Sequence, residues 1–268
     1  MNVYIQSLIL GVVQGLTELL PISSSAHLIL IPKIFGWGDI PDSFDVALHF
    51  GTLLAIALYF FKDWLELIKG GFNLVFKNDR TTEGKMFWYI VLATIPGGII
   101  GFLLDHFFEK NLKAPLIIAT ALIVMGIVLY YVDKKCESKI KYEKMGLRET
   151  FLIGISQALA FIPGVSRSGV TMTMGRLLKV ERESVARYSF MLSAPIVLAA
   201  TLYKFKDFEL NPQFFIGVIS SFLVGLAVIK FLMQYLKKGS FKIFAIYRVI
   251  IGVLVFILYF NNVLVTVK

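Results

Sequence analysis

The stretch QGLTELLPISSSAH, residues 14–27, decides the fold of this chain. It begins as an apolar helix, breaks at Pro21 and restarts with three consecutive serines. A second stretch, QALAFIPGVSRSGVT at residues 157–171, has the same plan, with its break at Pro163 and a new cluster of hydroxyl side chains. The first stretch contains a Glu and a His, and the second contains an Arg. Ionisable groups inside sequence this apolar indicate a functional site, and we interpret it as a site for a phosphate group.

The composition is typical of a membrane protein. Of the 268 residues, 57% are hydrophobic and 17% are charged, whereas soluble domains have about 45–50% and about 25%. The formal net charge is +9. Because Lys and Arg gather in the cytoplasmic loops of membrane proteins, we attribute this charge to topology and expect no nucleic-acid partner. No Lys or Arg precedes Lys33, so we expect no cleaved signal peptide.

The apolar segments predict an all-α integral membrane protein with six transmembrane helices, since one crossing needs roughly 20 residues. The predicted spans are Phe44–Phe61, Met86–Leu104, Ala114–Val132, Val185–Tyr203, Gln213–Leu236 and Lys242–Phe260. The polar segment 62–85 is expected to carry a short amphipathic helix. A short loop is predicted at 105–113, where we expect the His106 side chain to be solvated.

The segments beside the two prolines are too short to cross. Residues 151–162 would form a helix of about 18 Å, against a hydrocarbon core of roughly 30 Å, and residues 24–35 are equally few. Each pair is therefore predicted to be a re-entrant helical hairpin. Irregular backbone inside a bilayer is tolerated only where it is packed in protein or lines a wet cavity. We expect the tips, 21–25 and 163–168, to face a polar pocket.

The distribution of basic residues predicts the orientation. With two re-entrant hairpins and six spans, one side of the membrane holds 17 Lys and Arg residues in its loops and the other side holds six. The basic loop 133–149 lies on the richer side. By the positive-inside rule that side is cytoplasmic, and both termini lie outside.

The two halves of the chain also resemble each other. Gly11-Val-Val-Gln14 matches Gly154-Ile-Ser-Gln157, and Ser43-Phe44 matches Ser189-Phe190. We predict one membrane domain made of two repeats, about 1–132 and 150–263, joined by 133–149. A re-entrant hairpin plus three crossings is an odd unit, so the second copy must be inverted, and its broken helices can meet the first near the midplane.

The first stretch provides groups for acid–base chemistry. Gln14 and Glu18 lie on one helical face, and Glu18 could act as a base or, with Gln14, hold a divalent metal. Ser23, Ser24 and Ser25 open the next helix, with His27 one turn later. A His within hydrogen-bond reach of a Ser can activate it as a nucleophile, or can attack directly.

The second stretch is typical of an anion site. Gly164 lets the backbone bend closely, and the following helix presents free N–H groups. Arg167 adds a donor fork suited to phosphate, while Ser166, Ser168 and Thr171 add hydroxyls. Asp45 and His49 are further candidates for a supporting role. Together these groups suit phosphoryl transfer, in which a nucleophile of the protein attacks a substrate that is itself held in the bilayer.

Both stretches resemble the signatures of the undecaprenyl-diphosphate phosphatase family associated with bacitracin resistance. These are a Glu/Gln-x-x-x-Glu-x-x-Pro-x-Ser-Ser segment ending in His, and Pro-Gly-x-Ser-Arg-Ser-x-x-Thr. The similarity extends to Phe44-Asp45 and to Ala245-Ile-Tyr-Arg248. The resemblance implies a multi-pass enzyme of the bacterial plasma membrane that removes the terminal phosphate of a C55 polyprenyl diphosphate, with Mg²⁺ or Ca²⁺ as cofactor. The monophosphate product carries cell-wall sugars.

Carried over to this chain, the resemblance implies a set of site residues. Glu18, Ser24, His27 and Arg167 would form the catalytic core, and Ser23, Ser25, Gly164, Ser166, Ser168 and Thr171 would bind the phosphates. Gln14 stands where some members have Glu, which puts a two-carboxylate metal site in doubt. We hypothesise that Ser24 is the nucleophile and His27 its proton-handling partner, with the reverse roles left open.

A transporter or flippase, for an anion or for the lipid carrier itself, is the alternative function, because inverted repeats with broken helices would serve it equally well. The Ser–His–Glu set favours an enzyme, since translocation needs no nucleophile. The oligomeric state, a homodimer included, stays open at this level.

Overall fold

The structure, a computed structural model, describes residues 2–38 and 41–264, without the side chains of 101, 102 and 104–112. The described residues form eleven α-helices and three short 3₁₀ helices: α1 (Val3–Thr17), α2 (Ser24–Phe35), α3 (Asp42–Tyr59), α4 (Phe61–Phe76), α5 (Thr82–Leu112), α6 (Pro115–Lys135), η1 (Tyr142–Lys144), α7 (Leu147–Ser156), η2 (Gln157–Phe161), α8 (Arg167–Leu177), α9 (Arg182–Lys204), η3 (Phe205–Asp207), α10 (Pro212–Leu236) and α11 (Lys242–Phe260). The predicted all-α polytopic fold is confirmed.

The longer helices supply the membrane spans. Within the described residues, α6, α9 with η3, α10 and α11 are long and apolar enough to cross, and the pair α3–α4, bent by 79°, would make a fifth span. The remaining predicted span, Met86–Leu104, lies inside α5. The loop predicted at 105–113 is wrong, because α5 continues to Leu112; no Pro or Gly interrupts residues 102–114. The prediction for the His106 side chain lies outside the described residues.

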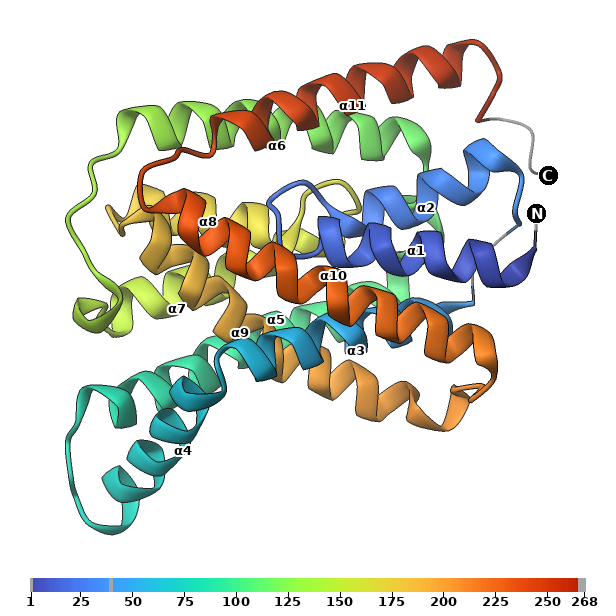
Figure 1. The fold of residues 1–268 in the computed structure, drawn as a ribbon. Coiled ribbons are helices and arrows are strands. Elements are labelled where there is room, and N and C mark those ends of the chain that lie inside the picture. Colours follow the sequence, from blue (N-terminus) through green and yellow to red (C-terminus); the bar gives the residue numbers. More distant parts are fainter. Residues whose placement is uncertain (1, 39–40, 265–268) are drawn as a thin grey trace.

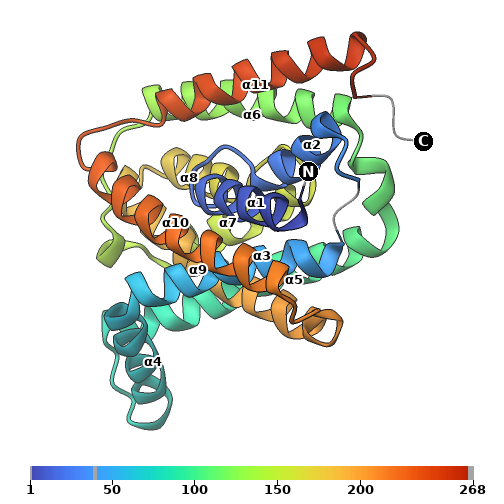
Figure 2. The same ribbon diagram turned by 45° about the vertical axis from the view of Figure 1, so that its right-hand side comes forward.

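The two predicted hairpins are present as pairs of short helices. At 1.5 Å per residue α1 is about 22 Å long and α8 about 16 Å, both shorter than a hydrocarbon core of roughly 30 Å. Figures 1 and 2 show α1 and α2 side by side at the end of the molecule that carries the N-terminus, and α7 and α8 approaching from the opposite end. The turns of the two hairpins meet in the middle of the bundle.

Helices of both halves pack around these turns. α1 packs against α10, α10 packs against α3, and α3 packs against α9. On the other side of the bundle, α6 and α11 pack against each other (Figure 1). The contact between α1 and α10 is very close. A Cβ added at Gly11 would fall 1.9 Å from Ser220 Oγ, and one added at Gly15 would fall 2.8 Å from the Ser221 carbonyl oxygen. Small residues allow such close backbone approach between membrane helices, and here they fix the helix that carries Glu18.

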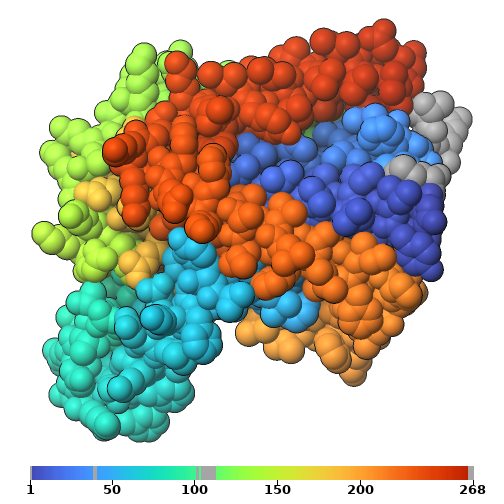
Figure 3. Space-filling model, in the orientation of Figure 1, coloured from blue at the N-terminus to red at the C-terminus, as the bar shows by residue number. Residues whose placement is uncertain are grey.

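The segment predicted to carry a short amphipathic helix forms the 16-residue α4. α4 and the beginning of α5 project from the body as an arm (Figure 3). Apolar side chains on α4 are exposed, among them Phe72 at 58% and Phe76 at 77%. Exposed rings of this kind suit a helix that lies in the membrane interface, so the arm stays apart from the helices around the two turns.

Candidate active site

The two hairpin turns have the same local structure. Ser23 caps α2 and Ser166 caps α8, and both have a positive φ, 76° and 71°. Each hydroxyl accepts a hydrogen bond from the backbone N–H three residues on, at 3.4 Å and 3.0 Å. Each also lies 3.2 Å from a second serine hydroxyl, that of Ser25 or Ser168. A non-glycine residue at positive φ costs of order 1–3 kcal/mol and is concentrated at functional sites, so both turns carry strain where the chemistry is predicted.

The two turns contact each other directly. The Gly164 N–H donates to Ser23 Oγ at 3.2 Å, and Ser168 Oγ donates to the carbonyl oxygens of Glu18 and Leu20 at 3.2 Å and 3.0 Å. Gly164 has φ of +98°, and an added Cβ would lie 2.6 Å from a carbonyl oxygen of α6. Only glycine fits there without movement. The separate signatures of the sequence are therefore parts of one site.

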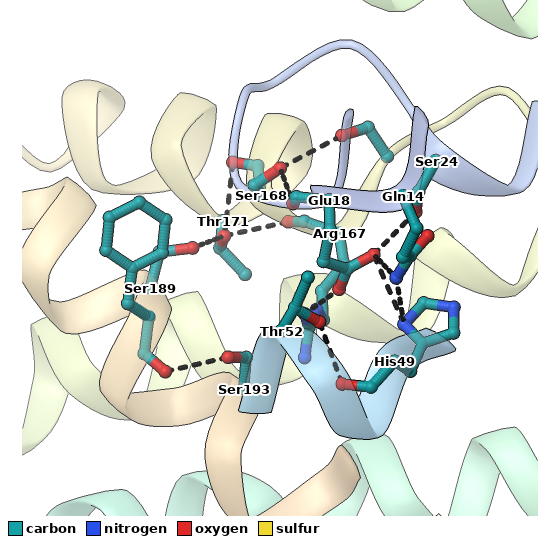
Figure 4. Close-up of polar contacts among 12 residues, drawn as sticks. Gln14, Glu18, Ser24, His49, Thr52, Arg167, Ser168, Thr171, Ser189 and Ser193 are labelled. Carbon is teal, nitrogen blue, oxygen red and sulfur yellow. Dashed lines mark hydrogen bonds and ion pairs between the residues drawn. The ribbon is translucent and has the colours of Figure 1, made fainter. Parts of the chain in front are cut away.

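Glu18 lies at the centre of this site, as Figure 4 shows. Its side chain is 5% exposed, and its Oε1 pairs with Arg167 Nη2 from the other hairpin. Ser24 Oγ donates to Oε2 at 2.5 Å, and Gln14 Nε2 donates to the same oxygen at 3.3 Å. The structure thus brings Gln14, Glu18, Ser24 and Arg167 together. Arg167 spends one of its five N–H donors on Glu18.

His49 is the member of the cluster that sequence reasoning placed only among supporting candidates. It lies on α3, and its Nδ1 is 3.3 Å from Glu18 Oε2 and 2.9 Å from Gln14 Nε2 (Figure 4). Its side chain is 24% exposed. Asp45 lies one helical turn earlier, with a buried Oδ1 that has no hydrogen-bond partner. The i, i+4 spacing of Asp45 and His49 was the available signal, but nothing in the sequence brings α3 to Glu18.

His27 differs from its predicted position beside Ser24. Its Nδ1 lies 2.7 Å from the Ser23 carbonyl oxygen and its Nε2 2.8 Å from the Tyr247 hydroxyl. The physical reason is helical geometry: His27 is four residues after Ser23, so its ring folds back onto the first turn of α2. The carbonyl accepts only from an N–H, which makes Nδ1 the donor and leaves Nε2 to accept from Tyr247 when the ring is neutral. Ser24 donates to Glu18 instead.

Several hydroxyls predicted to bind phosphate are engaged in holding the backbone. Ser23 and Ser166 cap helices, and Ser168 bonds the carbonyls of the first turn. Thr171 Oγ1 donates to the Arg167 carbonyl oxygen at 2.8 Å and lies 2.7 Å from Ser189 Oγ (Figure 4). Ser25 is only partly buried and contacts Ser23. These residues shape the site, whereas Ser24 and Arg167 carry the groups directed at Glu18.

The site offers a divalent cation only a few protein oxygen ligands. Among the described residues, no group of three or more His, Cys, Asp or Glu side chains could hold a metal ion. Gln14 Oε1 is nevertheless buried, and it has no hydrogen-bond partner among the described residues. Mg²⁺ is commonly bound through one or two protein oxygens plus substrate phosphates. Gln14 and Glu18 fit a cation that is completed by the phosphates of its substrate.

The arrangement combines a hydroxyl, a carboxylate that accepts its hydrogen bond, and a guanidinium that, among the described residues, donates only to that carboxylate. A base must lie within about 2.6–3.2 Å of the proton that it removes, and Glu18 Oε2 meets this for Ser24. Donors that stabilise negative charge complete the requirements for attack on a phosphorus centre. The site is buried between helices, so its substrate must reach it from within the bilayer or from one membrane surface.

Comparisons with known proteins agree with this chemistry. A family model described as "Bacitracin resistance protein BacA" matches residues 7–254. A relative from Pelotomaculum thermopropionicum named "Undecaprenyl-diphosphatase" is 49% identical over 256 residues, covering 94% of this chain and 96% of the relative. Relatives of the same name from Moorella thermoacetica and Desulforudis audaxviator are each 45% identical, with equal coverage of this chain.

Proposed function

The chain belongs to the bacitracin resistance protein BacA family, and on that premise we propose that it hydrolyses undecaprenyl diphosphate to the monophosphate and inorganic phosphate. Relatives that this chain matches over nearly their whole length are named for this activity. The reaction returns the lipid carrier to cell-wall synthesis, and it gives resistance to bacitracin. A phosphoanhydride hydrolase of the plasma membrane is the function that both the relatives and the site support.

One observation carries the proposal: Ser24 Oγ donates to Glu18 at 2.5 Å, while Arg167 pairs with the same carboxylate and donates to no other group among the described residues. Ser24 Oγ would attack the terminal phosphorus and pass its proton to Glu18. The bond from that phosphorus to the bridging oxygen breaks, and its electron pair leaves with the lipid monophosphate. Water then cleaves the phosphoserine and releases inorganic phosphate. Arg167 would stabilise the equatorial oxygens during both displacements.

His27 has a different proposed role from the one that its sequence position suggested. Bonded to the Ser23 carbonyl and to Tyr247, it would hold the first turn of the helix that carries Ser24. Direct attack by His27 would require Nε2 to leave the Tyr247 hydroxyl. A phosphoenzyme trapped on histidine rather than on serine would therefore reverse the assignment of the nucleophile.

A divalent cation, Mg²⁺ or Ca²⁺, belongs to the proposal. Gln14 and Glu18 would hold it, and the phosphates of the substrate would supply further oxygens. When bound, the ion would neutralise the charge of the diphosphate. The other predicted phosphate ligands, Ser25 and the N-terminal backbone of α8, would orient the headgroup.

We place the protein in the membrane with both termini outside and the site open to the outer face. The excess of Lys and Arg in the loops on the opposite side supports this orientation. We further propose that the domain consists of the two inverted repeats, 1–132 and 150–263. The matched serine caps Ser23 and Ser166, at φ of 76° and 71°, support that division.

The test is phosphate release from the C55 diphosphate by the purified protein in detergent. Ser24→Ala should lower kcat/KM by about 10⁴-fold or more, because loss of a nucleophile removes the covalent route. The variant should keep the melting temperature of the wild type within a few degrees. A well-folded wild type that releases no phosphate, but moves the lipid across proteoliposomes, would decide for the transporter.

A further inference from the structure

Arg248 is not one of the residues that the proposed mechanism uses. It is unusual among the described residues because its charged side chain is buried. It belongs to α11, is 0% exposed, and carries a permanent charge. In the described residues its hydrogen bonds go to backbone carbonyls and to no carboxylate. Burying an ionised group without a counter-charge is costly, so its position calls for an explanation.

The four carbonyls that accept from Arg248 belong to three separate segments. Nη1 donates to Pro21 at 3.0 Å, in the first hairpin turn. Nη2 donates to Gly164 and Val165 at 2.7 Å and 2.9 Å, in the second turn. Nε reaches the Leu122 carbonyl of α6 at 3.4 Å. One guanidinium thus bonds the backbone of both turns.

The surroundings of the guanidinium are matched to it. A Cβ added at Gly169, on the first turn of α8, would fall 2.6 Å from Arg248 Nη1. Any larger residue at Gly169 would therefore push the guanidinium away from the first turn. The absence of a side chain at Gly169 thus leaves the space that the Arg248 guanidinium occupies. Gly169 lies two residues after Arg167.

We propose that Arg248 is a positioning residue that fixes the first hairpin turn, and with it Ser24 and Glu18, relative to Arg167 on the second. This inference rests on the proposed phosphatase activity. The planar fork of arginine reaches carbonyls of both turns at once, whereas the ammonium of lysine is a single point donor. Loss of the clamp should misplace the nucleophile relative to the guanidinium that binds the phosphate, and a misplacement of about 1 Å can cost about 10²-fold in rate.

The experiment compares Arg248→Lys and Gly169→Ala with Arg176→Lys. Arg176 is also a buried arginine, but it lies near the end of α8 and pairs with Asp133. All are assayed at a temperature where circular dichroism shows them folded. For Arg248→Lys we expect kcat to fall about 30-fold or more, with KM for the lipid changed by less than about threefold. Gly169→Ala should show the same fall in kcat with a nearly unchanged KM, although it keeps every charge. Arg176→Lys should melt earlier but keep its kcat.

The outcomes separate the inference from the function on which it rests. An inactive wild type would refute the proposed phosphatase. An active wild type with near-normal kcat in both Arg248→Lys and Gly169→Ala would overturn the positioning role. So would activity that falls only in proportion to the unfolded fraction, the pattern of a purely structural residue. Should Arg248→Lys fail to fold, Gly169→Ala decides the matter, since it leaves the arginine in place.

Discussion

Two arginines on the same helix show how a site differs from a structural ion pair. Arg167 begins α8 and Arg176 lies near its end, and each pairs with a buried carboxylate of another helix, Glu18 or Asp133. Arg176 also donates to the carbonyl oxygens of 136, 137 and 180 and to the Ser138 hydroxyl. Among the described residues, Arg167 donates only to Glu18. The Arg176–Asp133 pair is therefore completed by the protein, whereas the Arg167–Glu18 pair leaves guanidinium donors for a ligand.

The two carboxylates, Asp133 and Glu18, differ in the same way as the arginines that pair with them. Asp133 accepts from Arg176 at 3.0 Å and from Arg182 at 2.7 Å, while its other oxygen accepts from the Phe241 N–H at 2.9 Å. Around Glu18, by comparison, Gln14 Oε1 and Asp45 Oδ1 are buried and have no hydrogen-bond partner in the part of the chain that the structure describes. Unsatisfied buried polar atoms cost roughly 1–3 kcal/mol each. We therefore infer that the surroundings of Glu18 are arranged to receive a ligand, whereas those of Asp133 are completed by the protein.

Of the changes that test the contrast between the two arginines, Arg167→Lys should have the largest effect. Lysine can keep the single bond to Glu18 and the charge, so the melting temperature should stay close to that of the wild type. The variant loses the donor fork, and we expect kcat/KM to fall by about 10³-fold, or about 4 kcal/mol. Phosphate release and thermal unfolding measured on the same preparation test this. A variant that loses its fold together with its activity would show that the pair is structural and would erase the contrast with Arg176.

Arg176→Lys should give the opposite result on the same helix. Lysine cannot reproduce the donors that now reach the carbonyl oxygens of 136, 137 and 180 and the Ser138 hydroxyl, so buried carbonyls would lose their partners. At about 1 kcal/mol for each lost hydrogen bond, we expect a loss of about 3 kcal/mol in the free energy of unfolding. Denaturation in detergent measures it, with kcat determined at low temperature. A fall in kcat of the folded variant would show that the ends of α8 are coupled.

Much of the fold could be predicted from the sequence because the hydrophobic effect acts on runs of residues. The spans and the two short arms follow from length and apolarity, and their breaks follow from Pro21 and Pro163. The end of α5 was missed, since charged residues near the end of a helix look the same in a sequence as the beginning of a loop. Helix boundaries depend on packing that no window of sequence contains.

The site was predictable as a set of residues but not as a geometry. The strong local signals of both turns, a proline followed by clustered hydroxyls, predicted Glu18, Ser24 and Arg167 as site residues, and the structure brings these three together. Ser24 pairs with Glu18 and not with His27, because the His27 ring folds back onto the first turn of its own helix. The sequence alone does not show which side chain will fold back in this way. Contacts from distant segments, such as those of His49 and Arg248, depend on tertiary packing and carry only weak signals in the sequence.

The smallest effect that we predict concerns Gln14→Glu. Gln14 Nε2 now donates to Glu18, and its Oε1 is buried without a partner. A second carboxylate would repel Glu18 until a cation bridges them, so we expect the cation concentration for half-maximal activity to fall about fivefold, or about 1 kcal/mol. A titration with Mg²⁺ and Ca²⁺ measures it. An unchanged midpoint would remove Gln14 from the proposed cation site.

Gln157→Glu is the matched control, because Gln157 holds the equivalent position in the second hairpin and also has a buried Oε1 without a partner. Its Nε2 donates to the Ala93 carbonyl oxygen at 3.0 Å, whereas Gln14 Nε2 donates to a carboxylate. A carboxylate there would face that carbonyl and destabilise the fold, with no change in the cation midpoint. Equal shifts in both variants would mean that a general change in charge, and not the Glu18 site, sets the response to the cation.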